Sequence, residues 1–121
     1  MIGIDLIKIE RMQGSIKRFG EKFLQRFLSD KEMKLVKNHK SAAGFWAAKE
    51  ACSKALGCGI GKECRFHDIH LSKTDKGAPL ITLNDSLLQR YDIQDISVSI
   101  THDGDYAVAV VAIEGKKTPS N

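Results

Sequence analysis

Four side chains with the chemistry to hold a metal ion and a phosphate group lie in three separate segments of this 121-residue sequence. Residues 44–57 read Gly-Phe-Trp-Ala-Ala-Lys-Glu-Ala-Cys-Ser-Lys-Ala-Leu-Gly. In a helix, which turns about 100° per residue, Glu50 and Lys54 project from one face. Asp5 and His102, in two distant segments, add a second carboxylate and an imidazole. The four together suggest a metal and phosphate site.

Asp5 decides how Glu50 and Lys54 are interpreted. By themselves, Glu50 and Lys54 have the spacing of an exposed ion pair on one helix, worth about 0.3 to 0.5 kcal/mol. Mg²⁺, however, prefers one or two carboxylates, keeps several waters and takes further ligands from substrate phosphates. We therefore expect Asp5 and Glu50 to bind Mg²⁺, with Lys54 neutralising a phosphate oxygen. His102 has a simpler alternative, a hydrogen bond to a neighbouring backbone group.

The helix expected around Glu50 also has an apolar face, which should pack in the core. The residues of this face are Phe45, Ala48, Cys52, Ala55 and Leu56. Trp46 falls on the polar face with Ser53, so it is either a partly covered core residue or a wall for a bound cofactor. Gly57 stands where a left-handed residue should end the helix.

Composition and charge restrict the class of protein. A hydrophobic content of 42% and a charged content of 28% are typical of a globular domain, and we expect a single one. We find neither an apolar run long enough to span a membrane nor a leader, so we expect a cytosolic protein. The net charge of +4 favours an acidic partner, which charge alone leaves open between nucleic acid, a phosphate-rich small molecule and an acidic protein. We expect reduced thiols at Cys52, Cys58 and Cys64.

The sequence should begin with a strand. Residues 1–9 alternate in the manner of a strand, which places Asp5 on the face opposite Ile2 and Ile4. We expect that the core does not use the face with Asp5.

Helices should follow this strand. Residues 10–28 have a helical pattern with a phenylalanine at every fourth position, and these should be core residues: Phe19, Phe23 and Phe27. Ser29 and Glu32 form a capping box, which predicts a helix that runs to about residue 37. Ser41 can cap the next helix, which contains residues 44–56.

The second half should form two antiparallel hairpins. The paired segments are 68–73 with 79–83, and 96–101 with 106–113. His102 lies at the end of the second hairpin, and a short helix is expected at 85–91.

The order of these elements predicts the fold class. Antiparallel strands combined with packed helices favour an α+β fold. We expect one domain over residues 1–115 and a polar tail at 116–121.

Four motifs, in order along the chain, resemble those of the holo-[acyl-carrier-protein] synthases, the small phosphopantetheinyl transferases. They are Gly-Ile-Asp at 3–5, Phe-Trp-Ala-Ala-Lys-Glu-Ala at 45–51 continued by Lys-Ala-Leu-Gly at 54–57, Gly-Ala-Pro at 77–79, and Ser-Val-Ser-Ile-Thr-His at 97–102. The resemblance covers nearly the whole chain, and Trp-x-x-Lys-Glu-Ala-x-x-Lys is a selective motif for its size.

The resemblance implies an activity and an oligomeric state. Enzymes of this family move the 4′-phosphopantetheine arm of coenzyme A to a serine of an apo acyl carrier protein, for fatty acid biosynthesis, and release adenosine 3′,5′-bisphosphate. They require Mg²⁺ and work as homotrimers with active sites between subunits. By resemblance, Asp5 and Glu50 would hold Mg²⁺ and Lys54 would stabilise the leaving phosphate, while Glu50 or a metal-bound water would accept the serine proton. The residues implied to contact coenzyme A are Lys54, Trp46, Gly57 and His102, the last from across the interface.

One motif position departs from the family. Many relatives have an arginine before the aromatic residue of the motif, where it helps to bind the 3′-phosphate of coenzyme A, and this chain has Phe45 there. Another cation must replace it, and Lys40, Lys49 and Lys62 are candidates. The resemblance also implies that an acidic helix of the carrier docks on the basic segment that holds Arg11, Lys17, Arg18 and Arg26.

Two other classes of protein explain less of the sequence. A nucleic-acid-binding module would account for the charge, but its strands should carry aromatic residues among the cations, and these strands carry only Tyr106. A structural oligomer would account for the apolar strands but gives no reason for Asp5, Glu50 and Lys54. We therefore expect an enzyme without a nucleic-acid or membrane partner.

Overall fold

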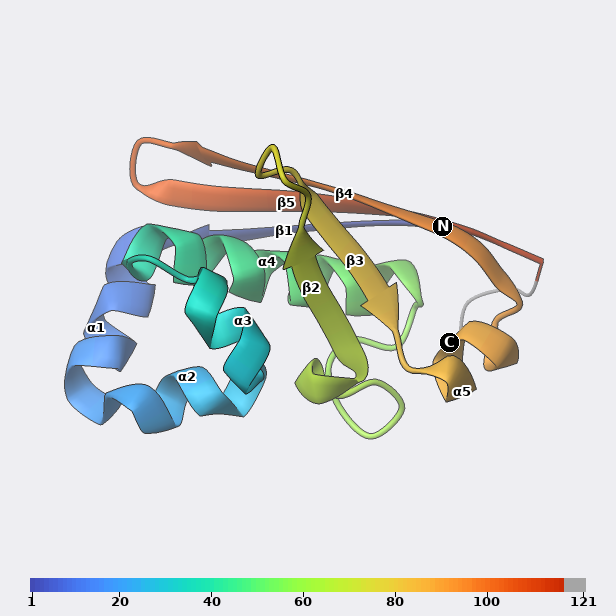
Figure 1. Cartoon of the computed structure of the whole chain (residues 1–121), viewed down its shortest axis with the longest axis horizontal. Helices are drawn as coiled ribbons and strands as arrows, with labels where there is room; N and C mark the ends of the chain where they lie inside the picture. The colour runs from blue at the N-terminus through green and yellow to red at the C-terminus, as the bar shows by residue number, and fades with distance from the viewer. Residues whose placement is uncertain (117–121) are drawn as a thin grey trace.

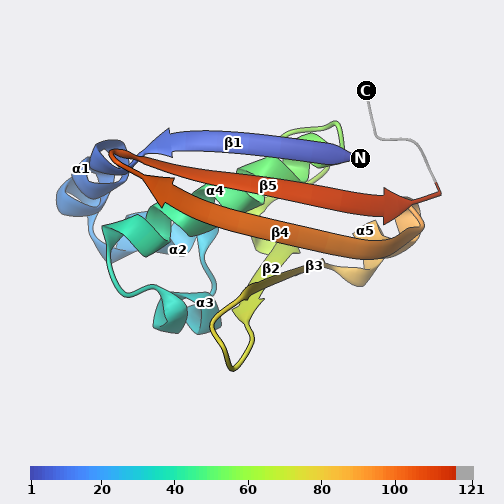
Figure 2. The same cartoon turned by 90° about the horizontal axis from the view of Figure 1, so that it is seen from above.

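The fold has two layers, a sheet and a group of helices beneath it. The computed structural model describes residues 1–116. Three antiparallel strands lie side by side in the order β1 (Ile2–Lys8), β5 (Tyr106–Gly115) and β4 (Ile93–Asp103). The helices lie together on one side of this sheet (Figures 1 and 2). The predicted α+β class with an antiparallel sheet and packed helices is confirmed.

The first strand joins the last one. β1 pairs with β5 along its whole length, from Ile2 opposite Ala112 to Lys8 opposite Tyr106. β5 is also the return strand of the predicted hairpin with β4, in which His102 is opposite Ala107. The hairpin is therefore confirmed, and β5 becomes the central strand because β1 covers its free edge.

The central helix, α4 (His39–Ala55), packs against the inner face of the sheet. The apolar face predicted for it is confirmed, since all five of its residues are buried: Phe45, Ala48, Cys52, Ala55 and Leu56. The helix begins earlier than predicted, and its N-cap is Asn38 rather than Ser41. Ser41 lies one turn into the helix, where its side chain completes the capping box with Asn38. Gly57, just past the end, has the predicted left-handed conformation, with φ of 83°.

The helix predicted at 10–28 is two helices, α1 (Ile9–Phe19) and α2 (Glu21–Phe27). Gly20 separates them in a conformation with φ of 67°, which favours glycine. The break turns the phenylalanine stripe, so that Phe27 is fully buried while Phe19 is half-exposed. The prediction that Phe19 is a core residue was wrong.

The capping box at the start of α3 (Asp30–Leu35) is confirmed. The Glu32 backbone N–H donates to Ser29 Oγ at 3.2 Å, and the Ser29 backbone N–H donates to Glu32 Oε1 at 2.8 Å. The helix ends at Leu35, two residues before the predicted end.

A second, two-stranded sheet lies beside the helices. It consists of β2 (Ile69–Lys73) and β3 (Pro79–Leu83), the first predicted hairpin, preceded by the short 3₁₀ helix η1 (Phe66–Asp68). The predicted short helix is α5 (Asp85–Arg90). Cys52, Cys58 and Cys64 are free thiols, as expected.

The outer face of the three-stranded sheet has no helix over it among the described residues (Figure 2). It is apolar over β1 and the middle of β5, whereas β4 presents Ser97, Ser99 and Thr101 there. Ile2 is 74% exposed, and the other large exposed side chains on this face are Ile4, Leu6 and Val110. The alternation in β1 was predicted correctly, but its two faces were assigned wrongly. Asp5 lies on the face that packs toward α4, whereas Ile2 and Ile4 face solvent.

In residues 1–116, no helix is both long and apolar enough to cross a membrane. The predicted tail at 116–121 lies outside the described residues except for Lys116.

Candidate active site

Asp5, Glu50 and Lys54 line one cavity, as predicted. β1 and α4 lie side by side, and the cavity between them and α1 has a volume of about 330 Å³. Lys54 Nζ is 2.8 Å from Asp5 Oδ1 and donates a second hydrogen bond to the Ile4 carbonyl oxygen at 3.2 Å. The Asp5 side chain is only 14% exposed, so this ion pair is more sheltered than a surface pair on one helix. Lys54 thus joins the strand to the helix at the site.

The charge of Asp5 acts on Glu50. Partial burial is the main factor that raises the pKa of Glu50, the negative charge of Asp5 raises it further, and the positive charge of Lys54 opposes both. A divalent cation between the two carboxylates would relieve this repulsion. In residues 1–116 no group of three or more side chains is arranged to hold a metal ion. Two carboxylates beside a cavity therefore suit Mg²⁺, which keeps waters and takes phosphate ligands, better than an ion held by protein alone.

Gly3 lets the strand come close to the helix, a role that the sequence analysis did not assign. A Cβ on Gly3 would lie 1.9 Å from the Ala51 carbonyl oxygen and 2.6 Å from the Ala55 backbone nitrogen. Any larger residue would push β1 away from α4. The signal in the sequence was a glycine inside a strand, two residues before Asp5, which often marks a close approach of two backbones.

Trp46 is a partly covered core residue, one of its two predicted roles, and it also lines the cavity, while its contact with a cofactor stays a prediction. Its ring stacks on Phe23 with a centroid distance of 5.9 Å and meets Phe27 edge-on at 5.1 Å. Phe66 contacts the same ring at 4.8 Å. Trp46 and Phe23 both line the cavity with Glu50, which gives the site a rigid aromatic side.

The arginines predicted to dock a carrier occupy two places. Arg11 lines the cavity of Asp5 and Glu50, next to the proposed metal ligands. Arg18 and Arg26 lie apart from it around the exposed ring of Phe19, at 5.2 Å and 5.9 Å from its centroid. All three are exposed and belong to α1 and α2.

His102 lies at a second cavity, of about 200 Å³, that shares no lining residue with the first. Its Nε2 is 2.8 Å from the Lys40 carbonyl oxygen, which is the backbone contact considered above as the simpler alternative. The residues around this cavity include parts of two sequence motifs: Gly44, Phe45, Gly77, Pro79, Ile100 and His102. Within one chain, His102 is therefore not brought together with Asp5 and Glu50.

The cation next to Phe45 is Lys73, which the sequence analysis missed. Lys73 Nζ lies 5.8 Å from the centroid of the Phe45 ring, and both residues line the second cavity. Lys49 is unsuitable as the replacement cation, because its side chain is fully buried and paired with Glu32. No local signal identifies Lys73, since it lies 28 positions after Phe45 in the sequence.

Gly57 lines neither cavity. It is exposed at the end of α4, where its backbone N–H donates to the Lys54 carbonyl oxygen at 2.9 Å.

Comparison with known proteins assigns the family. A sequence model of the 4′-phosphopantetheinyl transferase superfamily matches residues 1–111. The chain belongs to this superfamily. It is an enzyme, a phosphopantetheinyl transferase, as the motifs indicated.

Individual relatives narrow the assignment within the superfamily. A protein of Sulfurimonas denitrificans named holo-[acyl-carrier-protein] synthase is 61% identical over 114 residues, which are 94% of each chain. The crystal structure of the Helicobacter pylori holo-[acyl-carrier-protein] synthase in complex with coenzyme A has a TM-score of 0.92 and 52% identity, over 94% of this chain and 100% of that one. The synthase of Bacillus anthracis, also in a complex with CoA (3′,5′-ADP), has a TM-score of 0.80 and 35% identity, over 95% and 96% of the two chains.

Proposed function

We propose that this phosphopantetheinyl transferase moves the 4′-phosphopantetheine arm of coenzyme A to a serine of an apo acyl carrier protein and releases adenosine 3′,5′-bisphosphate. The observation that carries the proposal is the meeting of Asp5, Glu50 and Lys54 at one cavity. The names and coenzyme A complexes of the relatives support the two substrates. The product would serve fatty acid biosynthesis, and the cytosolic location expected from the sequence remains a prediction.

Asp5 and Glu50 are the proposed ligands of Mg²⁺. Bound there, the ion would neutralise the charge of the coenzyme A pyrophosphate, which is the chemistry that this transfer most needs. Lys54, held by Asp5 and the Ile4 carbonyl oxygen, is positioned to stabilise the negative charge that develops on the leaving phosphate.

The transfer itself forms one bond and breaks one. The serine Oγ of the carrier bonds to the phosphorus of the phosphopantetheine, and the bond from that phosphorus to the bridging oxygen of adenosine 3′,5′-bisphosphate breaks. The serine proton would pass to Glu50 or to a water bound to the ion, since a cation held by Asp5 and Glu50 would offset the repulsion that raises the pKa of Glu50 without it.

The second cavity is proposed to hold the nucleotide end of coenzyme A in a neighbouring subunit's site. Lys73, beside Phe45, is the proposed replacement for the arginine that binds the 3′-phosphate in relatives. His102 lines the same cavity and would contact the cofactor from there. The separation of this cavity from Asp5 and Glu50 supports a site shared between two chains.

A homotrimer is proposed to bring the two cavities together. Support comes from an exposed apolar patch that β1 and the middle of β5 form on the sheet, since large exposed apolar patches mark contact surfaces. The patch consists of Ile2, Ile4, Leu6 and Val110. Light scattering tests the proposal, and a monomer that is fully active at low concentration would contradict it.

The carrier is proposed to dock on α1 and α2. Arg11 lies nearest the cavity, where the carrier serine must arrive, and Arg18 and Arg26 extend the positive surface away from it. An acidic helix is the expected counterpart.

The direct test is to incubate the protein with coenzyme A, Mg²⁺ and an apo acyl carrier protein and to weigh the carrier by mass spectrometry. The expected result is a carrier heavier by one phosphopantetheine group. Carriers that stay unmodified after long incubation would refute the proposed function.

A further inference from the structure

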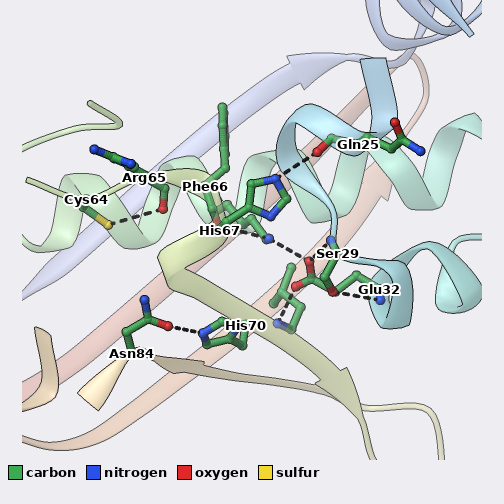
Figure 3. Close-up of polar contacts among 11 residues, drawn as sticks. Gln25, Ser29, Glu32, Cys64, Arg65, Phe66, His67, His70 and Asn84 are labelled. Atoms are coloured by element: carbon green, nitrogen blue, oxygen red, sulfur yellow. Dashed lines mark hydrogen bonds and ion pairs between the residues drawn. The ribbon is translucent and has the colours of Figure 1, made fainter. Parts of the chain in front are cut away.

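A lysine and a glutamate that do not line the active-site cavity form a fully buried ion pair beside it. Lys49 Nζ lies 2.8 Å from Glu32 Oε1, and the two side chains are 0% and 3% exposed. Lys49 belongs to α4 and Glu32 to α3, so the pair joins two helices. Figure 3 shows the Glu32 carboxylate at the centre of its polar contacts.

Backbone groups satisfy the rest of the pair. Glu32 Oε1 accepts from the Ser29 backbone N–H and Oε2 accepts from the Leu71 backbone N–H, both at 2.8 Å. Lys49 also donates to the Phe66 carbonyl oxygen at 3.1 Å. The pair therefore connects α3, α4, η1 and β2 through directional contacts.

Stability alone is a weak explanation for such a pair. Burial lowers the pKa of Lys49, which shows the cost of placing its charge in the core, although Glu32 opposes the shift. Well-packed apolar residues often stabilise a fold as well as a buried ion pair does. A hydrogen-bonded pair differs from apolar packing in that it fixes direction and register.

The directions fixed here lead to the active site. Lys49 immediately precedes Glu50, so holding the Lys49 side chain fixes the rotation of α4 from which Glu50 projects. The Phe66 carbonyl oxygen accepts from Lys49, and the Phe66 ring packs on Trp46, a wall of the cavity. The pair thus acts on both the carboxylate and the aromatic side of the site.

We infer that Glu32 and Lys49 are positioning residues, which hold Glu50 and the Trp46 wall in the geometry that binds the metal ion. This inference rests on the proposed function. Neither residue reaches the cavity, so both act through their neighbours on α4 and η1.

The test compares two single variants, Glu32→Gln and Lys49→Met, with the variant that carries both. Each single variant leaves a buried group without its charged partner, whereas the double variant leaves no buried charge unpaired. We expect the singles to melt at lower temperature and the double variant to regain most of the loss. The matched control is Glu63→Gln, because Glu63 forms an exposed pair with Arg90 at 3.7 Å. If Lys49→Met does not fold, Glu32→Gln and the double variant carry the comparison.

Three measurements separate positioning from stability. The first is acrylamide quenching of Trp46, the only tryptophan of the chain, in metal-free protein. The second is binding of Mn²⁺ alone, followed by electron paramagnetic resonance. The third is transfer kinetics. For positioning, the double variant melts close to wild type yet shows altered quenching, about tenfold weaker Mn²⁺ binding and about tenfold lower kcat, with little change in the KM for the carrier.

Two results would overturn the inference. One is a double variant in which Trp46 quenching, Mn²⁺ binding and kcat all return to wild-type values together with the melting temperature. The other is a Glu63→Gln control whose melting temperature, Mn²⁺ binding and kcat fall as much as those of Glu32→Gln. A wild-type protein that binds no Mn²⁺ would refute the proposed metal site instead. Acrylamide quenching of Trp46 would then still test whether the ion pair positions the aromatic wall. Quenching that is unchanged in all variants would overturn the inference.

Discussion

Replacing Gly3 with alanine should separate the two elements that build the active site. The new Cβ would lie 1.9 Å, 2.6 Å and 2.9 Å from three backbone atoms of α4. Ordinary contacts begin at 3.4 Å, so the shortest of these distances must grow by 3.4 − 1.9 = 1.5 Å. Backbone atoms of a buried helix cannot turn away as a side chain can. We therefore expect β1 to move away from α4 and to carry Asp5, two residues further on, away from Glu50.

The displacement required of β1 sets the expected effect on catalysis and stability. A misplacement of about 1 Å can reduce a rate about 100-fold, so kcat should fall by about that factor or more in Gly3→Ala. Overpacking of a well-packed interior costs about 1 to 3 kcal/mol. For a chain of this length the melting temperature should fall by about 4 °C for each kcal/mol.

The assay is transfer to an apo carrier, with thermal unfolding measured on the same samples. Gly61→Ala is the matched control, because a Cβ there meets nothing within 4 Å and the residue neither lines either cavity nor lies on the proposed docking helices. Alanine there should leave both transfer and the melting temperature close to wild type. A Gly3→Ala protein with wild-type kcat and melting temperature would refute the close packing of β1 on α4.

Three further predictions concern single residues of the site. Glu50→Gln should abolish transfer but raise the melting temperature near neutral pH. The pKa of Glu50 is raised in the folded protein, so the stability that its carboxyl contributes is lost as pH rises through that pKa, and a neutral amide avoids the loss. A melting temperature below that of wild type would contradict the prediction. Lys73→Ala should raise the KM for coenzyme A about tenfold or more, and Lys76→Ala, at an exposed lysine that does not line the cavity, is the control. An equal rise in KM in both variants would place the 3′-phosphate elsewhere. Arg11→Glu should raise the KM for the carrier far more than the KM for coenzyme A, and the difference from wild type should shrink as salt screens the charges. Unchanged carrier kinetics would show that the carrier docks elsewhere.

Local patterns in the sequence predicted most of the elements and the central part of the site. The capping box of Ser29, the apolar face of α4 and both hairpins depend on contacts between residues close in the chain, and all were confirmed. That Asp5, Glu50 and Lys54 meet was predicted from the residue types that bind a metal and a phosphate, together with the family motifs.

Contacts between distant segments were not predictable in the same way. The pairing of β1 with β5 decides which face of β1 is buried, and no local pattern shows that a sheet can leave Ile2 and Ile4 exposed. Lys73 reaches Phe45 only because β2 folds back beside α4.

Lys49 was considered as a cation for the 3′-phosphate because of its charge, but the structure shows that it is buried. A lysine is rarely buried unless it is paired, and its partner Glu32 is 17 residues away. Its position was nevertheless informative, because at about 100° per residue Lys49 falls about 40° from Phe45, at the edge of the apolar face.

The most direct test of the account is the metal dependence of transfer in wild-type protein and in Asp5→Asn. With coenzyme A and an apo carrier, mass spectrometry should show phosphopantetheine on the carrier only when a divalent cation is present. Asp5→Asn should remain folded and leave the carrier unmodified at the same Mg²⁺ concentration. Modification of the carrier by wild-type protein in excess chelator, or wild-type rates in Asp5→Asn, would contradict a site in which Asp5 and Glu50 hold the ion.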